Sequence, residues 1–143
     1  MAETLVLDTS ALMQAVISDT YTKATQLLLK RLWDDDPLEV YILEFTLVEC
    51  TNVVWKHIQR QGITKEQALA EIKRLIALPL NIHPSIDLLP RSLEIANQSQ
   101  LAVYDAVYVA LAERYQLTLV TVDEKQSAAA QQLHITVYRE IPC

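Results

Sequence analysis

The sequence contains a single glycine among its 143 residues, and this scarcity excludes several kinds of site. The P-loop and the dinucleotide-binding fingerprint each need two or more glycines at fixed spacing, because the backbone must approach the phosphates closely. The Gly-x-Ser-x-Gly turn of the α/β-hydrolases also needs two glycines. We therefore expect neither a phosphate-cradling glycine loop nor a serine-hydrolase elbow.

Cysteine and long apolar runs are also scarce. The chain has two cysteines, of which Cys50 lies within a helical pattern and Cys143 is the last residue, so a disulfide framework is not expected. No run of about 18 apolar residues predicts a membrane span. Residues 1–4 include an acidic residue and no basic one, which differs from the start of a signal peptide. We expect a cytoplasmic protein without a membrane segment.

Basic residues are too few for a protein that holds nucleic acid by charge alone. The 12 Lys and Arg residues face 18 Asp and Glu residues, which leaves a net charge of −6. Setting aside four carboxylates that bind a divalent cation would leave −2, and the ion would reverse the local sign. The acidic balance therefore disfavours a plain binding module more than a metal-dependent nuclease.

Short apolar, β-branched runs alternate with helical patterns along the chain. The predicted strands cover residues 4–7, 40–43, 80–83, 118–122 and 135–138. The predicted helices cover residues 11–17, 22–33, 47–60, 65–77, 88–97, 105–115 and 124–132. Gly62 is expected to stop the third of these helices, and Thr64 with Gln67 forms a capping box that starts the fourth. This alternation, with 51% hydrophobic residues, predicts one α/β domain with a mostly parallel sheet.

Two aspartates, Asp8 and Asp123, end apolar strand patterns. Ligands of open parallel sheets bind outside the carboxyl ends of the strands, so both residues stand where a site is expected. Each could equally be the N-cap of the helix that follows. For Asp8 the two interpretations are balanced, and the pair by itself is weak support for a site.

Two further acidic residues begin helical patterns. Thr46 and Glu49 match a capping box, which would make Glu49 a helix-start residue. Lys56 and Arg60 follow on the same helical face as Glu49. That face could hold a metal ligand with phosphate-contacting cations, or it could be a solvated surface. Without the other acids, a solvated surface is the favoured interpretation of this face. Asp105 opens a very apolar helix, where the helix dipole favours a carboxylate but burial would require a partner for it.

The hypothesis of a metal site depends on these four acids meeting. Four carboxylates within roughly 4–6 Å of one another would repel strongly unless a cation compensated them. Ligation by oxygen alone indicates Mg²⁺ or Mn²⁺ and not zinc. The three histidines, His57, His83 and His134, lack zinc-site spacing, and residues 34–36 lack the pattern of a calcium loop.

The stretches around the four acids resemble the PIN domains of VapC-type toxins. They read LDTSAL at 7–12, ECTNVV at 49–54, YDAVYVALA at 104–112 and LVTVDE at 119–124, in the order and spacing of that family and across nearly the whole chain. One departure is Gln116, which stands near the position where the family commonly has a glycine before the strand leading to the fourth acid.

The resemblance implies one PIN domain over residues 1–143, an α/β/α sandwich whose five-stranded parallel sheet has the order 3-2-1-4-5. It implies Mg²⁺- or Mn²⁺-dependent cleavage of RNA, a homodimer and a small antitoxin partner. The implied site residues are Asp8, Glu49, Asp105 and Asp123 as catalytic metal ligands, with Ser10, Asn52 and Thr121 as their supports. Lys56 and Arg60, which share the helical face of Glu49, are the expected contacts to the substrate.

Three other interpretations remain possible at this point. A receiver-type phosphoacceptor domain would need paired acids after the first strand and an acceptor aspartate after the third, and neither is evident. A phosphatase of the Asp-x-Asp type would need a second aspartate at Ser10. A non-catalytic PIN-like domain that binds nucleic acid or protein is disfavoured by the presence of all four acids.

Overall fold

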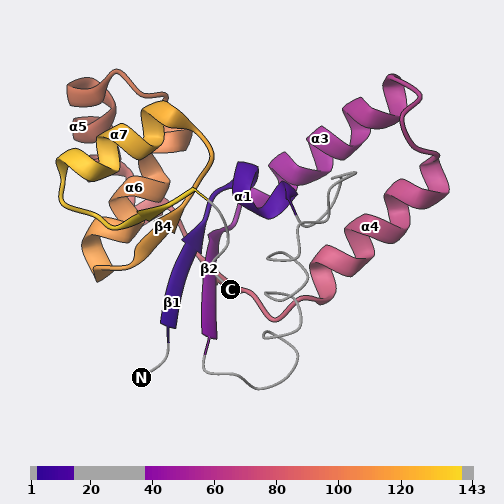
Figure 1. Ribbon diagram of the computed structural model, residues 1–143, viewed down its shortest axis with the longest axis horizontal. Coiled ribbons are helices and arrows are strands. Elements are labelled where there is room, and N and C mark those ends of the chain that lie inside the picture. Colours follow the sequence, from indigo (N-terminus) through magenta and orange to yellow (C-terminus); the bar gives the residue numbers. More distant parts are fainter. Residues whose placement is uncertain (1–2, 15–37, 140–143) are drawn as a thin grey trace.

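The computed structural model describes residues 3–14 and 38–139 of the chain, and Figure 1 shows their arrangement. Its elements are β1 (Glu3–Leu7), α1 (Thr9–Met13), β2 (Leu38–Leu43), α3 (Thr46–Gln59), α4 (Lys65–Ala77), β3 (Asn81–His83), the 3₁₀ helix η1 (Ile86–Leu88), α5 (Leu89–Ser99), α6 (Val103–Tyr115), β4 (Thr118–Val120), α7 (Glu124–Gln132) and β5 (Val137–Tyr138). The helix predicted at 22–33 and the end of the one at 11–17 lie outside the described residues.

The five strands form one parallel sheet in the order β3-β2-β1-β4-β5, which confirms the predicted topology. The central strand β1 pairs with β2 on one side and with β4 on the other, with Leu7 opposite Val120. The strands predicted at 118–122 and 135–138 are shorter than expected, ending at Val120 and starting at Val137. Because β1 and β4 are parallel neighbours, the residues that follow them leave the same edge of the sheet.

Helices cover both faces of the sheet, with α3 and α4 on one side and α5, α6 and α7 on the other (Figure 1). Leu5 and Leu7 of β1 point into the core beneath α3 and α4, whereas Val6 between them packs with α5 and α6. This alternation follows from the two-residue period of a strand, and the two clusters together give the expected α/β/α sandwich. Among residues 3–14 and 38–139, no helix has the length and apolar character to cross a membrane.

The connection between α3 and α4 only partly follows the sequence prediction. The left-handed residue that ends α3 is Gln61, with a φ of 59°, and not Gly62. Gly62 instead donates its N–H to the His57 carbonyl at 2.9 Å. The capping box of α4 is present as predicted, since the Thr64 hydroxyl accepts from the Gln67 N–H and the Gln67 side chain accepts from the Thr64 N–H.

Glutamine also takes the place of glycine at the ends of α5 and α6. Gln100 and Gln116 adopt left-handed conformations with φ of 56° and 53°. At the end of α6 this turn lets the Leu117 N–H bond to the Ala112 carbonyl at 2.9 Å and directs the chain into β4. The departure at Gln116 therefore preserves the turn, at the steric cost that any side chain pays in this region.

Replacing Gln116 by glycine should stabilise the protein by about 1 kcal/mol, because glycine carries no steric penalty in the left-handed region. Thermal unfolding should then show a Tm higher by roughly 3 °C. The control is Gln131→Gly within α7, where a helical backbone predicts a loss of about 1 kcal/mol. A Gln116→Gly protein that melts at or below the parent temperature would show that the entropy which glycine adds to the unfolded chain outweighs any strain relieved at this position.

Candidate active site

The four predicted acids line one pocket of about 380 Å³ at the carboxyl edge of the sheet. They come from four segments of the chain, namely the end of β1, the first turn of α3, the first turn of α6 and the segment after β4. The pocket is lined by Asp8, Thr9, Ser10, Met13, Glu49, Val53, Asp105, Tyr108 and Asp123. Residues as far apart in sequence as 8 and 123 therefore meet in one small volume.

Asp8 is buried, with 5% of its surface exposed, and both oxygens of its carboxylate are hydrogen-bonded. Oδ1 accepts from the Ser10 hydroxyl at 2.7 Å and from the Ala11 N–H at 2.8 Å, and Oδ2 accepts from the Thr121 hydroxyl at 2.6 Å. Asp8 is thus the N-cap of α1 and also a wall of the pocket, so both interpretations of this residue hold. Burial raises its pKa, and the three hydrogen bonds oppose that rise.

Glu49 is not part of the capping box that the sequence suggested. The N-cap of α3 is Phe45, and the hydroxyl of Thr46 accepts from the Leu43 N–H at 3.0 Å. Because the Thr46 hydroxyl is turned toward the end of β2, it does not cap the helix. The Glu49 carboxylate instead accepts a hydrogen bond of 2.7 Å from the Thr9 hydroxyl, which aims it into the pocket.

Tyr108 is a pocket residue that the sequence reasoning missed. Its side chain is 2% exposed, and its hydroxyl lies 2.7 Å from the Thr46 hydroxyl, 3.2 Å from that of Thr9 and 3.3 Å from the Glu49 carboxylate. Burial raises the pKa of this phenol far above neutral pH, so Tyr108 remains an uncharged donor. The available signal was its place three residues after Asp105, one helical turn along α6.

Asp105 is half-buried and shows the mutual repulsion of the cluster most clearly. Its pKa is raised, first by burial and then by the negative charges of Asp123, Asp8 and Glu49. No hydrogen bond to its carboxylate is present within the described part of the chain. The pocket therefore places an unpaired carboxylate among three others, as a cation site requires.

Asp123 is exposed and caps α7, because its Oδ1 accepts from the Gln126 N–H at 2.7 Å. Thr121 joins it to Asp8: the Thr121 hydroxyl accepts from the Asp123 N–H at 3.0 Å and donates to Asp8. Ser10 also bridges the two strand ends, since its hydroxyl donates to Asp8 and accepts from the Val122 N–H at 3.3 Å. Ser10 and Thr121 thus both donate to the Asp8 carboxylate, and their role as supports of a metal site stays a prediction.

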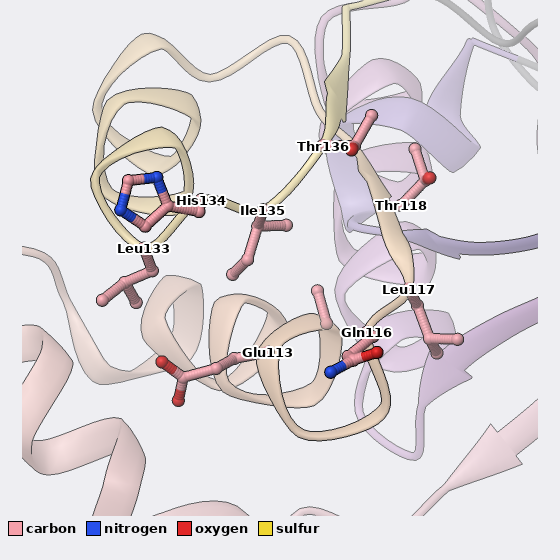
Figure 2. Close-up of a pocket in the computed structure, with 9 residues that line it drawn as sticks. Glu113, Gln116, Leu117, Thr118, Leu133, His134, Ile135 and Thr136 are labelled. Carbon is pink, nitrogen blue, oxygen red and sulfur yellow. The ribbon is translucent and has the colours of Figure 1, made fainter.

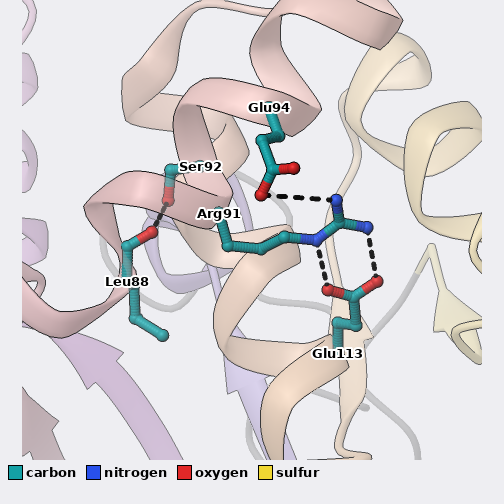
Figure 3. Close-up of polar contacts among 5 residues, drawn as sticks. All are labelled: Leu88, Arg91, Ser92, Glu94 and Glu113. Atoms are coloured by element: carbon teal, nitrogen blue, oxygen red, sulfur yellow. Dashed lines mark hydrogen bonds and ion pairs between the residues drawn. The ribbon is translucent and has the colours of Figure 1, made fainter.

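The other three predicted residues do not line the pocket. Asn52 and Lys56 on α3 and Arg60 at its C-cap are exposed, and among the described residues the Asn52 side chain makes no hydrogen bond with Glu49. Some cations elsewhere are already engaged, since Arg91 of α5 clamps Glu113 of α6 with bonds of 2.7 and 2.9 Å (Figure 3). Lys56 and Arg60 have no ion pair within residues 3–14 and 38–139.

The donor set fits a hydrated Mg²⁺ or Mn²⁺ better than a closed metal cage. In the described residues, no group of three or more His, Cys, Asp or Glu side chains is already arranged to hold an ion. Mg²⁺ is usually bound by one or two carboxylates together with water and substrate oxygens, so a preformed cage is not required. The charged groups that line the pocket are all carboxylates, and burial together with their like charges raises the pKa of Asp105, so a divalent cation would relieve their repulsion.

A larger hollow of about 470 Å³ lies away from these acids. Figure 2 shows its lining at the amino ends of β4 and β5, with Thr118 and Thr136 on one side and Glu113 and His134 on the other. None of the four predicted acids lines it. Volume therefore does not identify the candidate site in this chain, whereas the convergence of acids does.

Comparison with known proteins agrees with this geometry. The model of the PIN domain family matches residues 5–132. Ribonuclease VapC3 of Pyrobaculum aerophilum is 30% identical over 89 residues, which are 61% of this chain and 68% of that protein.

Solved structures show the same fold. The crystal structure of PAE2754 from Pyrobaculum aerophilum has a TM-score of 0.70 and 26% identity, over 95% of this chain and 83% of that one. A toxin-antitoxin complex from Klebsiella pneumoniae has a TM-score of 0.56 and 22% identity, over 87% of this chain and 90% of that one. The chain therefore belongs to the PIN domain family, among its VapC-type members.

Proposed function

We propose that this protein is a Mg²⁺- or Mn²⁺-dependent endoribonuclease and the toxin of a toxin-antitoxin pair. The observation that carries the proposal is the convergence of Asp8, Glu49, Asp105 and Asp123 on one pocket, where burial first and then the charges of the other three raise the pKa of Asp105. The similarity to a protein named as a ribonuclease supports RNA as the substrate.

Some of the four carboxylates would hold the ion together with water, and neighbouring side chains would keep the carboxylates in place. A bound Mg²⁺ or Mn²⁺ supplies charge that stabilises a phosphate oxygen and acidifies a coordinated water. Asp8 is fixed by three hydrogen bonds, and Glu49 is fixed by Thr9 with Tyr108 close by. Asp105 has no such restraint on its carboxylate among the described residues, so it can adjust to the ion.

Lys56 and Arg60 are proposed to contact the RNA backbone beyond the pocket. Lys56 follows Glu49 by seven residues on α3, and Arg60, the C-cap of that helix, follows by eleven, so the helical period puts all three on nearly the same side. Both cations are exposed, as a phosphate contact requires. Asn52 on the same helix is proposed to support Glu49 once substrate is bound.

A small antitoxin protein and a second copy of the chain are the proposed partners, in the cytoplasm, with residues 1–143 acting as one domain. Support for the antitoxin comes from the fold shared with a toxin-antitoxin complex. Support for the cytoplasm comes from the buried free thiol of Cys50, which suits a reducing compartment.

A non-catalytic PIN-like binding domain is the second candidate, favoured by the absence of a preformed three-ligand group among the described residues. The receiver-type interpretation loses its basis, because receiver sheets have the order 2-1-3-4-5 and this sheet has the order 3-2-1-4-5. Cleavage of RNA by the purified protein therefore separates the two remaining candidates.

Replacing Asp105 by asparagine should lower metal-dependent RNA cleavage by more than about 100-fold, because even residues outside the first ring of metal ligands contribute 10- to 100-fold. The stability of the metal-free protein should rise in the same variant. A carboxylate whose pKa is raised by folding destabilises the folded state as the pH climbs above its ordinary value of 3.8, and asparagine has no charge to lose.

The measurements for Asp105→Asn are cleavage of a labelled single-stranded RNA with Mn²⁺ and thermal unfolding with EDTA at pH 7. The matched control is Asp87→Asn, an exposed aspartate in η1 away from the pocket, which should leave both unchanged. Parental cleavage by Asp105→Asn would remove this residue from the site.

Mn²⁺ should bind the folded protein and raise its Tm, by an amount that corresponds to about 2.7 kcal/mol when the ion is at 100 times its dissociation constant. The shift should shrink strongly in Asp123→Asn, because one of the four oxygen donors is weakened. Isothermal titration with Mn²⁺ checks the same point directly. Cleavage that persists in EDTA, together with an unchanged Tm on adding Mn²⁺, would contradict metal dependence.

Substituting both Lys56 and Arg60 by alanine should weaken RNA binding and flatten its salt dependence. For single strands, each phosphate contact contributes about 0.7 to the slope of log affinity against log salt, so the slope should fall by about 1.4. Fluorescence anisotropy with a labelled RNA across several salt concentrations measures the slope. The control is the double variant Lys65→Ala and Lys73→Ala on α4. An equal loss of RNA affinity in the two double variants would mean that net charge alone causes the effect.

A further inference from the structure

A buried glutamine on α7 contacts the segments of two acids at once. Gln126 has no exposed surface. Its side-chain N–H donates to the backbone carbonyl of Asp105 at 2.9 Å, and its backbone N–H donates to the carboxylate of Asp123 at 2.7 Å. One residue thus connects the first turn of α6 to the first turn of α7.

The other half of the Gln126 amide is unsatisfied. Its Oε1 is buried and has no hydrogen-bond partner within the described residues. The amide cannot turn over to improve this, because Oε1 would then face the Asp105 carbonyl oxygen. A buried acceptor without a partner lowers stability, so an apolar side chain of the same size would serve the core as well or better.

The packing around Gln126 explains what its single side-chain bond adds. On α7, Ala129 and Ala130 are buried in the same cluster as Ala106 and Val109 of α6, and such contacts do not fix one particular offset between the helices. The Asp105 carboxylate has no hydrogen bond of its own in the described residues. Its place relative to Asp123 therefore depends on the bond from Gln126 to the Asp105 carbonyl.

We propose that Gln126 is a positioning residue that holds Asp105 and Asp123 at the separation at which they share one divalent cation. The proposal rests on the metal-dependent function proposed above. It assigns to this amide a role that packing does not require, which accounts for a glutamine where the core would favour an apolar side chain.

The test compares Gln126→Met, which keeps the volume and removes the donor, with Gln126→Asn, which keeps the amide but is one methylene too short. The control is Gln132→Met, an exposed glutamine on the same helix. For each protein, calorimetric titration gives the Mn²⁺ dissociation constant, thermal unfolding in EDTA gives the metal-free Tm, and RNA cleavage is followed against Mn²⁺ concentration.

In Gln126→Met, the Mn²⁺ dissociation constant should rise by about 10- to 100-fold, while the metal-free Tm is unchanged or higher because the orphaned oxygen is gone. Cleavage should need correspondingly more Mn²⁺. Gln126→Asn should lose the same affinity, and Gln132→Met should match the parent. A merely structural glutamine would not produce this loss of Mn²⁺ affinity without a loss of metal-free stability.

Parental Mn²⁺ affinity in Gln126→Met would overturn the positioning role while leaving the proposed function intact. A fall in the metal-free Tm that accounts for the loss of affinity would also overturn it, since Gln126 would then only support the fold. If the parent protein itself neither bound Mn²⁺ nor cleaved RNA, the proposed function would fail first and this inference with it.

Discussion

The parallel pairing of β1 with β4 is the constraint on which the site depends. Leu7 lies opposite Val120, and the Asp8 N–H continues the ladder by bonding to the Val120 carbonyl at 3.3 Å. The chain segments that carry Asp8 and Asp123 are therefore brought to one edge by backbone hydrogen bonds that are indifferent to charge. The repulsion among the acids is imposed by the sheet and cannot be relieved by moving its strands apart.

Neutral hydroxyl groups make this imposed proximity tolerable for some of the acids. Thr121 and Ser10 satisfy Asp8, and Thr9 satisfies Glu49. Asp105 receives no comparable bond among the described residues that would oppose the rise in its pKa caused by burial and by the neighbouring charges. The pocket thus combines carboxylates held in fixed positions with one that is restrained mainly through its backbone, where Gln126 contacts it.

The apolar runs predicted the strands and a mostly parallel sheet, whereas the strand order followed only from the family resemblance. Strand-end acids of a parallel sheet are expected at one edge, but the hydrogen bonds that hold them there could not be predicted. Glu49 shows where local reading fails: Thr46 and Glu49 satisfy the spacing of a capping box, but the Thr46 hydroxyl bonds to Leu43 on β2. The same hydroxyl also lies 2.7 Å from that of Tyr108 on α6, a tertiary contact that the spacing of residues along α3 does not reveal.

Tyr108 and Gln126 illustrate the same limit in the core. A tyrosine in an aliphatic helix and a glutamine in an alanine-rich one look like ordinary variation in sequence. Only the packing of α6 and α7 shows that both side chains are buried and what their polar atoms reach. Lys56 on α3 and Arg60 at its C-cap are exposed, as a solvated helical face allows, and their contact with substrate stays a prediction.

The left-handed glutamines that end α3, α5 and α6 have a consequence for the denatured chain. A glycine at each of these turns would relieve strain in the native state, but it would also give the unfolded polypeptide more conformations to lose on folding. Glutamine restricts that disordered ensemble, so part of the native strain is offset by a smaller loss of chain entropy. With one glycine in the whole sequence, the protein applies this compromise at Gln61, Gln100 and Gln116 alike.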